Sequence, residues 1–409
     1  MRAYERLLKY VKIHTTSDNS TGTSPSTMRQ FDLARILVDE MKELGIEDAH
    51  VDENCYVYGS IPASLGYEKC KQIGFISHMD TAPDYCGENV CPLIHENYDG
   101  KEIFLKDGHV LSPDKFPDLN EMKGKTLITS DGSTLLGADD KAGVAEIMTM
   151  AEEILREGSP HGRISIAFTP DEEIGNGARD MDLESFGADF AFTVDGGPVR
   201  ELCYENFNAA AAEFTVRGIC VHPGEAKNRM VNASLLATEI VSLIPPAERP
   251  EHTEGREGYY CLMSLEGNLG TAKAKFIIRD HDSGLFEAKI HTLKMIEKNL
   301  NEKYGRGTVN LSIREEYKNM IEKIRPNMHL IEHAREAVRL AGMEPAEIAI
   351  RGGTDGAQLS FRGLPCPNLG TGGYAFHGPY EHIAAEDMDD TVRVLKGIIA
   401  GYAKTEEEV

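Results

Sequence analysis

Polar side chains that could bind a metal ion follow short apolar segments at several places in the sequence. They are His78, Asp80, Glu172, Glu173 and Asp195. Successive side chains alternate along an extended chain, so His78 and Asp80 share one side of it. A zinc-binding His usually donates its second ring N–H to a carboxylate, and Asp80 is placed for that role. Taken alone, however, such a His-x-Asp pair is more typical of a hydrogen-bonded His at a surface strand end.

Two acidic clusters allow both a structural and a chemical interpretation. Asp139 and Asp140 stand at the start of a predicted helix, where one carboxylate would cap the helix and stabilise it by about 0.5–2 kcal/mol. One Asp is enough for a cap, so the other is available for chemistry. Asp171, Glu172 and Glu173 are adjacent carboxylates, and their mutual repulsion would be removed by a cation. A solvated acidic turn is the alternative, although the segment before it is almost entirely apolar.

A glycine-rich segment, residues 370–378, could bring one more ligand from the C-terminal part of the chain. The candidate ligands are then two histidines and three acids: His78, Asp139, Glu173, Asp195 and His377. Zinc suits this mixture best, with Co²⁺ or Mn²⁺ as substitutes. Five ligands suit two ions better than one tetrahedral ion, and two ions about 3.5–4 Å apart can activate a bridging water. Glu172 is not needed as a ligand and would act as the general base.

The apolar segments that precede these side chains are typical of buried strands. They are residues 73–77, 164–169 and 190–194. Strands that are nearly all apolar are covered on both faces, as in α/β sheets with helices on either side. Amphipathic helices are predicted for residues 31–44 and 142–156. Because ligands gather at the carboxyl ends of strands in such sheets, the candidate side chains are expected to meet there.

The pattern changes between residues 208 and 318. Alternating segments predict half-exposed strands at 212–219, 259–266, 272–279 and 308–314, with helices at 230–243 and 285–300. The order β-α-β-β-α-β is that of a ferredoxin-like unit. The predicted organisation is therefore a catalytic domain in two parts, 1–207 and 319–409, interrupted by an inserted lid domain at 208–318.

Composition and charge exclude several classes of function. Lys and Arg number 43 against 67 Asp and Glu, a net charge of −24, which disfavours nucleic-acid and membrane partners. No segment approaches the roughly 18 apolar residues of a membrane helix, and residues 1–13 lack the features of a signal peptide. Eight cysteines without a C-x-x-C pair are typical of free thiols in a reducing cytosol. We therefore expect a cytoplasmic protein, with an acidic tail at 406–408 that frays.

Taken as a set, these motifs resemble those of the co-catalytic zinc aminoacylase/carboxypeptidase family. The resemblance rests on residues 77–81, 137–141, 169–173 and 194–197 and on the His377 loop. It runs from the N-terminal helix nearly to the C-terminus. It implies a zinc-exopeptidase-type mixed α/β sheet flanked by helices, with an inserted ferredoxin-like α+β lid. It also implies an aminopeptidase that removes the N-terminal residue from tripeptides.

The resemblance assigns a role to each candidate residue. His78 and Asp195 would hold one zinc ion, Glu173 and His377 the other, and Asp139 would bridge the two. Glu172 would be the general base, and Asp80 would orient His78. The peptide bond that follows Asp139 is expected to be cis.

The length of the substrate suggests further binding residues. A tripeptide spans about 10 Å at 3.3–3.6 Å per residue. If the metal ions lie at its first peptide bond, a cation that far away would hold the free C-terminal carboxylate. Arg279 and Arg351 are candidates for a bidentate clamp, and the alternative for each is a surface ion pair. His222 could stabilise the oxyanion, from the same chain or from a partner in a homodimer.

Two other functions are compatible with the same motifs. A related zinc amide hydrolase, such as a deacylase or a carboxypeptidase, would use the same metal ligands. A metal-dependent binding protein without catalytic activity should lack an acid that is free of the metal, whereas Glu172 is present. A blocked N-terminus separates the first two, because an acetylated tripeptide should resist an aminopeptidase and suit a deacylase.

Overall fold

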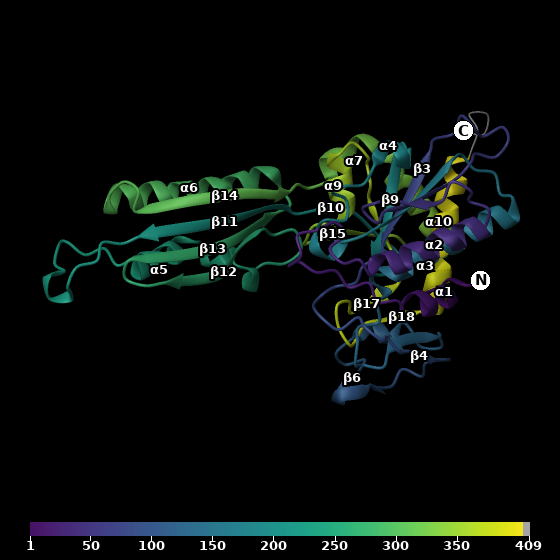
Figure 1. The fold of residues 1–409 in the computed structure, drawn as a ribbon, viewed down its shortest axis with the longest axis horizontal. Helices are drawn as coiled ribbons and strands as arrows, with labels where there is room; N and C mark the ends of the chain where they lie inside the picture. The colour runs from purple at the N-terminus through teal and green to yellow at the C-terminus, as the bar shows by residue number, and fades with distance from the viewer. Residues whose placement is uncertain (404–409) are drawn as a thin grey trace. The chain divides into compact units, whose positions relative to one another are not determined.

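The chain folds into two compact units (Figure 1). The computed structural model describes residues 1–403, so the tail at 406–408 lies outside the described residues. The first unit comprises Met1–Tyr204, Glu322–Ile348 and the chain from Thr354 onward, and the second comprises Glu205–Ile321 and Ala349–Gly353. The second unit, called here the inserted unit, therefore also takes a short segment that follows the residues 208–318 expected from the sequence.

The first unit is built on an eight-stranded mixed sheet, with strand order β1-β2-β8-β3-β9-β16-β10-β15. In chain order the strands are β1 (His50–Val51), β2 (Val57–Ile61), β3 (Ile73–His78), β8 (Ile164–Thr169), β9 (Phe190–Gly196), β10 (Glu201–Asn206), β15 (Ala346–Ile350) and β16 (Asn368–Gly370). The central strands β8, β3, β9 and β16 pair in parallel. Strands β1 and β2 pair antiparallel with their neighbours, and β10 pairs antiparallel with β16. The carboxyl ends of the parallel strands therefore meet at one edge of the sheet.

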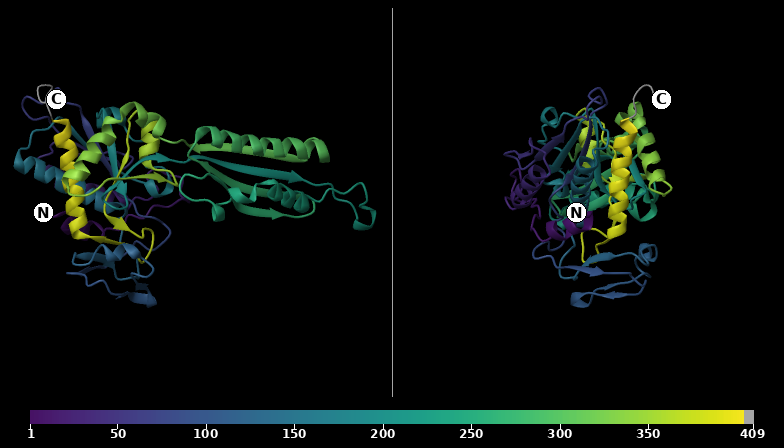
Figure 2. Two further views of the ribbon diagram at one scale, coloured as in Figure 1. Left: turned by 180° about the vertical axis from the view of Figure 1, so that it is seen from behind. Right: turned by 90° about the vertical axis from the view of Figure 1, so that its right-hand side faces the viewer.

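Helices cover both faces of this sheet, as the sequence predicted. They include α1 (Ala3–Tyr10), α2 (Gln30–Glu43), α3 (Ala138–Glu157), α4 (Leu183–Phe186), α8 (His329–Leu340), α9 (Asp355–Phe361) and α10 (Ala385–Tyr402). One face packs in a core with side chains from α4 and α9, where Phe186 and Leu359 meet Ile76 and Ala167. On the other face α3 packs against β3 and β9. Helix α10, yellow in both views of Figure 2, lies against α3 and α8.

A smaller antiparallel sheet joins two distant parts of the first unit. Its strand order is β17-β18-β7-β4, with β4 (Pro92–His95), β7 (Leu127–Ser130), β17 (Gly373–Tyr374) and β18 (His382–Ala384). The two-stranded pair β5 (Ile103–Phe104) and β6 (Val110–Leu111) lies in the same stretch of chain as β4 and β7. Because β17 and β18 flank residues 375–381, this sheet fixes both ends of the loop that carries His377.

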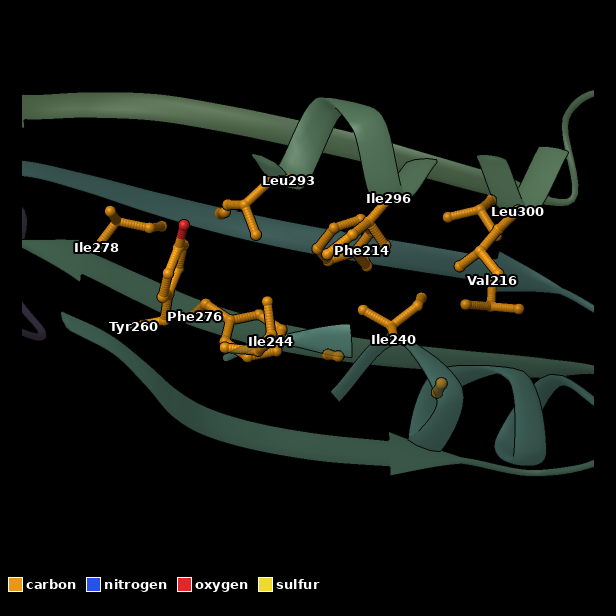
Figure 3. Packing of buried hydrophobic residues seen from close by; sticks show 14 of the residues in the cluster. Phe214, Val216, Ile240, Ile244, Tyr260, Phe276, Ile278, Leu293, Ile296 and Leu300 are labelled. Carbon is orange, nitrogen blue, oxygen red and sulfur yellow. The ribbon is translucent and has the colours of Figure 1, made fainter. Parts of the chain in front are cut away.

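The inserted unit has the expected element order. It consists of β11 (Asn208–Arg217), α5 (Ala233–Leu243), β12 (Tyr259–Gly267), β13 (Thr271–Asp280), α6 (Ser283–Tyr304) and β14 (Val309–Tyr317). Its sheet has the order β12-β13-β11-β14 with antiparallel pairs. Figure 3 shows how Phe214 and Phe276 of the sheet meet Ile240 of α5 and Leu293 of α6. Burial of these alternating side chains explains the half-exposed pattern of the sequence.

Three buried asparagines close the base of the inserted unit, where the chain enters and leaves it. Asn206 accepts a hydrogen bond from Met320 N at 2.7 Å, and Asn319 accepts one from Asn206 N at 3.1 Å. Asn208 accepts from Asn319 N at 3.0 Å. These amide groups satisfy backbone groups of both chain segments, so the two segments hold each other in place.

Two expectations about the environment of the chain concern helices and thiols. Among residues 1–403, no helix has the length and apolar character needed to cross a membrane. All eight cysteines are free thiols.

Candidate metal centre

Five side chains from distant parts of the sequence converge in the first unit. His78 Nε2 lies 3.0 Å from Asp139 Oδ1 and 3.5 Å from Asp195 Oδ1. His377 Nε2 lies 3.2 Å from Asp139 Oδ2 and 3.0 Å from Glu173 Oε2. The two oxygens of Asp139 therefore face two different histidines, each of which has a second carboxylate beside it. These are the five side chains that the sequence nominated as metal ligands.

The main sheet explains why these side chains meet. His78 is the last residue of β3, and Asp195 lies near the end of β9. Glu173 follows β8 in a short 3-10 helix, and Asp139 stands at the start of α3. Since β8, β3 and β9 are adjacent and parallel, their carboxyl ends form the place where ligands bind in such sheets. His377 comes from the loop between β17 and β18.

Asp139 and Asp140 depart from helical geometry although they open α3. Asp139 has φ −82° and ψ 105°, and the peptide bond between the two residues is cis, as expected. Asp140 turns into the interior, where its carboxylate accepts hydrogen bonds from Ser77 Oγ and from His78 N. Asp140 also lies within reach of an ion shared by His78 and Asp195.

Asp80 connects a candidate ligand to the candidate base. Its side chain is fully buried, and its Oδ1 lies 3.3 Å from His78 Nδ1. The same carboxylate accepts hydrogen bonds from Glu172 N at 3.0 Å and from Glu173 N at 3.2 Å. Asp80 therefore restrains the His78 ring and the backbone of the acidic turn at the same time.

The carboxylates of this centre perturb one another strongly. Burial and the charge of Asp139 raise the pKa of Glu173 to about 7, and burial raises the pKa of Asp195 to about 6. Hydrogen bonds to Asp139 and Glu173 raise the pKa of His377 to about 11. Burial would raise the pKa of Asp139 as well, but hydrogen bonds with His377 and His78 outweigh it and keep that pKa low. The cluster therefore requires positive charge, which protons or metal ions can supply.

The residues present fit a divalent cation. Glu173 Oε1 and Asp140 Oδ1 are buried oxygens without a hydrogen-bond partner among residues 1–403, and the Glu173 side chain is only 5% exposed. Burying an acceptor of this kind is costly unless it is satisfied. Imidazole nitrogens and carboxylate oxygens are ligands that zinc accepts. A cation between these groups would satisfy the unpaired oxygens and relieve the repulsion.

Glu172 lies at the same site but projects from the turn beside Glu173. Burial first, and then the charges of Asp195 and Asp355, raise its pKa well above the ordinary value. The adjacent Glu173 side chain faces His377.

Two further acids shape the centre, and the sequence did not single out either role. Glu381 is buried and accepts hydrogen bonds from the backbone at residues 136, 137 and 139. Asp171 accepts hydrogen bonds from Ser26 and Gln30 and thereby ties the acidic turn to the start of α2. In each of these hydrogen bonds the donor and the acceptor lie far apart in the sequence, so only the fold reveals the contacts.

The three predicted substrate-binding residues belong to the inserted unit. His222 is exposed in the loop after β11, where its Nδ1 accepts a hydrogen bond from Gly224 N at 3.2 Å. The ten residues of β11 extend about 33 Å, so His222 lies far along this unit from Asn208. The other two residues are arginines that lie in different surroundings.

Arg279 is an ion-paired residue near the end of β13. Its Nη2 lies 3.0 Å from Glu316 Oε2, and its Nη1 donates to the carbonyls of Ala210 and Ile278. Its guanidinium also stands 5.3 Å from the ring centroid of Tyr317. These contacts fix the side chain and compensate its charge.

Arg351 has mainly neutral partners. Its Nη1 donates to the carbonyls of Gly255 at 2.7 Å and Glu257 at 3.1 Å, and its Nη2 donates to Thr253 Oγ1 at 3.1 Å. The guanidinium also stands 5.1 Å from the ring centroid of Phe207. Its position is therefore ordered although none of these partners is a carboxylate.

Zinc should stabilise the folded protein through this centre. At free zinc 100 times the dissociation constant, binding to the native state alone adds about 2.7 kcal/mol to the free energy of unfolding. Zinc added to the metal-stripped protein should therefore raise Tm, measured by differential scanning calorimetry. Asp139→Asn should lose most of this rise, because Asp139 faces both histidines. Exposed Glu96→Gln is the control, and an undiminished rise in Asp139→Asn would contradict the assignment.

Comparison with known proteins agrees with this architecture. Residues 130–401 match the model of Peptidase family M20/M25/M40. Peptidase T of Halothermothrix orenii is 51% identical over 405 residues, which cover 98% of this chain and 99% of that protein.

Solved structures share the fold over nearly the whole chain. The crystal structure of aminopeptidase PepT from Bacillus cereus has a TM-score of 0.79 at 22% identity and covers 98% of both chains. A tripeptidase from Staphylococcus aureus has a TM-score of 0.77 at 22% identity, over 99% of this chain and 98% of that one. These likenesses confirm the mixed α/β fold predicted from the sequence.

Proposed function

Because the chain belongs to peptidase family M20/M25/M40, we propose that this peptidase is a dinuclear zinc aminopeptidase that removes the N-terminal residue from tripeptides. The observation that carries the proposal is the position of Asp139, whose two oxygens face His78 and His377. Such an arrangement suits a carboxylate that bridges two ions. The 51% identity to a peptidase T and the fold shared with a tripeptidase support the choice of substrate.

The roles of the five ligands follow from their contacts. His78 and Asp195 would hold one zinc ion, Glu173 and His377 would hold the other, and Asp139 would bridge them. When bound, such an ion pair polarises the substrate carbonyl and lowers the pKa of water. Co²⁺ and Mn²⁺ accept the same nitrogen and oxygen ligands.

Glu172 would move the proton during hydrolysis. It would take a proton from the attacking water and return it to the amine that leaves. Burial raises the pKa of Glu172, which helps it hold the proton between these two transfers. Asp80 keeps the base in place, because its carboxylate accepts the N–H groups of Glu172 and Glu173 while it contacts His78.

Arg351 is the better candidate for the clamp on the C-terminal carboxylate. The charge of Arg279 is already compensated by Glu316, whereas Arg351 is ordered by carbonyls and aromatic rings. A guanidinium that is ordered and has no carboxylate partner among the described residues is prepared for a bidentate contact. Arg279 would support the same subsite from β13.

The remaining assignments concern the inserted unit and the setting of the enzyme. Residues 208–318 would serve as a lid over the catalytic domain formed by 1–207 and 319–409. His222 would stabilise the oxyanion, supplied by the same chain or by a second copy in a homodimer. Eight free thiols support a cytoplasmic location.

Glu172→Gln should separate metal binding from catalysis. The amide cannot act as a base, so kcat should fall by about 10²–10⁴, while the zinc content per chain stays that of the parent protein. Tripeptide hydrolysis and bound zinc are measured on the same preparation, with exposed Glu184→Gln as the control. Turnover close to that of the parent would rule out Glu172 as the base.

Arg351→Ala should harm peptides according to their C-terminus. Loss of a charge-assisted bidentate contact, worth about 1.5–3 kcal/mol, corresponds to roughly 10–150-fold in kcat/KM. This loss is expected for tripeptides with a free carboxylate and not for C-terminally amidated ones. Arg279→Ala should show a weaker preference of the same kind. Equal losses on free and amidated peptides would argue against the clamp.

A substrate panel distinguishes the aminopeptidase from related amide hydrolases. Tripeptides with a free N-terminus should be cleaved after their first residue, and faster than di- or tetrapeptides. Their N-acetylated forms should resist cleavage, since the proposed site accepts a free amino end. Mass spectrometry of the products identifies the bond that is cut, and preferred cleavage of the acetylated peptides would favour a deacylase instead.

A further inference from the structure

Glu381 is a buried carboxylate that lies four residues beyond His377. Its Oε2 accepts hydrogen bonds from Leu136 N and Gly137 N, each at 2.8 Å. Its Oε1 accepts a hydrogen bond from Asp139 N at 2.9 Å. One side chain therefore satisfies three peptide N–H groups of the turn that leads into α3.

The turn needs an acceptor of this kind because it has no helical partner for these groups. Peptide N–H groups at the start of a helix have no carbonyl to bind. Gly137 is left-handed at φ 80°, and Asp139 has extended dihedral angles. A buried carboxylate forms shorter and stronger bonds to such donors than a neutral acceptor would.

Glu381 is itself held on a rigid support. His382, the next residue, begins β18, which pairs with β7. The buried His382 ring lies with its Nε2 2.6 Å from Asp118 Oδ2 and its Nδ1 2.7 Å from the carbonyl of Tyr380. The carboxylate of Glu381 is thus attached to the small antiparallel sheet through residues on both sides of it.

We propose that Glu381 is a positioning residue that sets the place of the Asp139 carboxylate between the two proposed ions. The inference rests on the proposed function, since it assumes that Asp139 bridges a metal pair. Glu381 would act through the backbone of Asp139, because its two oxygens accept hydrogen bonds from peptide N–H groups. Because Glu381 and His377 share one loop, Glu381 also couples the position of His377 to that of Asp139.

The coupling matters because a bridging carboxylate tolerates little displacement. Asp139 has to offer one oxygen to each ion, and the two histidines that mark these positions lie 3.0 Å and 3.2 Å from its oxygens. Functional groups of this kind must be held to within about 0.5 Å of their working geometry. Partners that orient a ligand from behind typically change metal affinity about 10–100-fold when they are altered.

Glu381→Gln is the direct test, because the amide has the same shape but a single acceptor oxygen. Its NH₂ group would face peptide N–H donors, so at least one of the three hydrogen bonds is lost. We expect Co²⁺ or Zn²⁺ affinity to fall about 10–100-fold for at least one ion, measured by isothermal titration calorimetry. The visible absorption spectrum of the Co²⁺ protein should change, and kcat at saturating metal should fall with KM within about twofold of the parent.

Glu146→Gln is the matched control. Glu146 is also a fully buried glutamate of the first unit, seven residues beyond Asp139 in α3. Within the described part of the chain, neither of its side-chain oxygens has a hydrogen-bond partner, so the change to Gln removes a buried carboxylate without breaking such a bond. Metal affinity, Co²⁺ spectrum and kcat of this variant should match those of the parent.

The outcomes separate this inference from the proposed function. If the parent binds two ions and cleaves tripeptides, and Glu381→Gln is indistinguishable from it in affinity, spectrum and kcat, the positioning role is wrong and the function stands. The positioning role is equally wrong if Glu381→Gln lowers only the Tm of the metal-free protein. A parent protein that binds no metal would overturn both.

A second measurement covers the case in which Glu381→Gln does not fold. Hydrogen exchange of the metal-free parent, read by NMR at the amides of Leu136, Gly137 and Asp139, reports the three bonds directly. All three amides should exchange slowly, as expected for bonds to a buried acceptor. Fast exchange at these positions would overturn the proposal.

Discussion

Repulsion between buried carboxylates is the constraint on which the rest of this site depends. Asp139, Glu173 and Asp195 lie within a few ångströms of two histidines, and Asp140 and Glu172 share the same surroundings. Removing so many like charges from water is costly unless positive charge is placed among them. The imidazoles supply part of it, and a buried oxygen of Glu173 still has no hydrogen-bond partner among residues 1–403. A divalent cation would supply the rest and satisfy this oxygen.

A second set of acids makes such crowding structurally possible. Asp80, Asp171 and Glu381 accept several hydrogen bonds each, largely from backbone N–H groups. They fasten the acidic turn, the start of α2 and the turn before α3 to strands of the two sheets. The acids near the centre thus form two groups. One group has the geometry of metal ligands, and the other, Asp80, Asp171 and Glu381, holds the loops by hydrogen bonds.

Most of what can be predicted from the sequence rests on short local motifs, namely apolar strands and the polar side chains that follow them. Strands β3, β8 and β9 are mostly apolar and are buried over five or more residues, so the sequence shows where they end and which polar side chains follow. The small antiparallel sheet cannot be recognised in the sequence in this way, because β17 has two residues and β18 three, too few for a periodic pattern. The contacts of Glu381 join residues more than 240 positions apart, and no local pattern encodes such a pairing. Helix α3 is bounded at Ala138, but Asp139 and Asp140 have non-helical dihedral angles, so its regular part begins after them, near the expected residue 142.

Anomalous scattering from crystals grown with zinc would show whether the five side chains hold a metal pair. We expect two peaks per chain at the zinc absorption edge, about 3.5–4 Å apart, one beside His78 and the other beside His377, with Asp139 between them. A single peak, or peaks away from these residues in a crystal of active enzyme, would contradict this expectation.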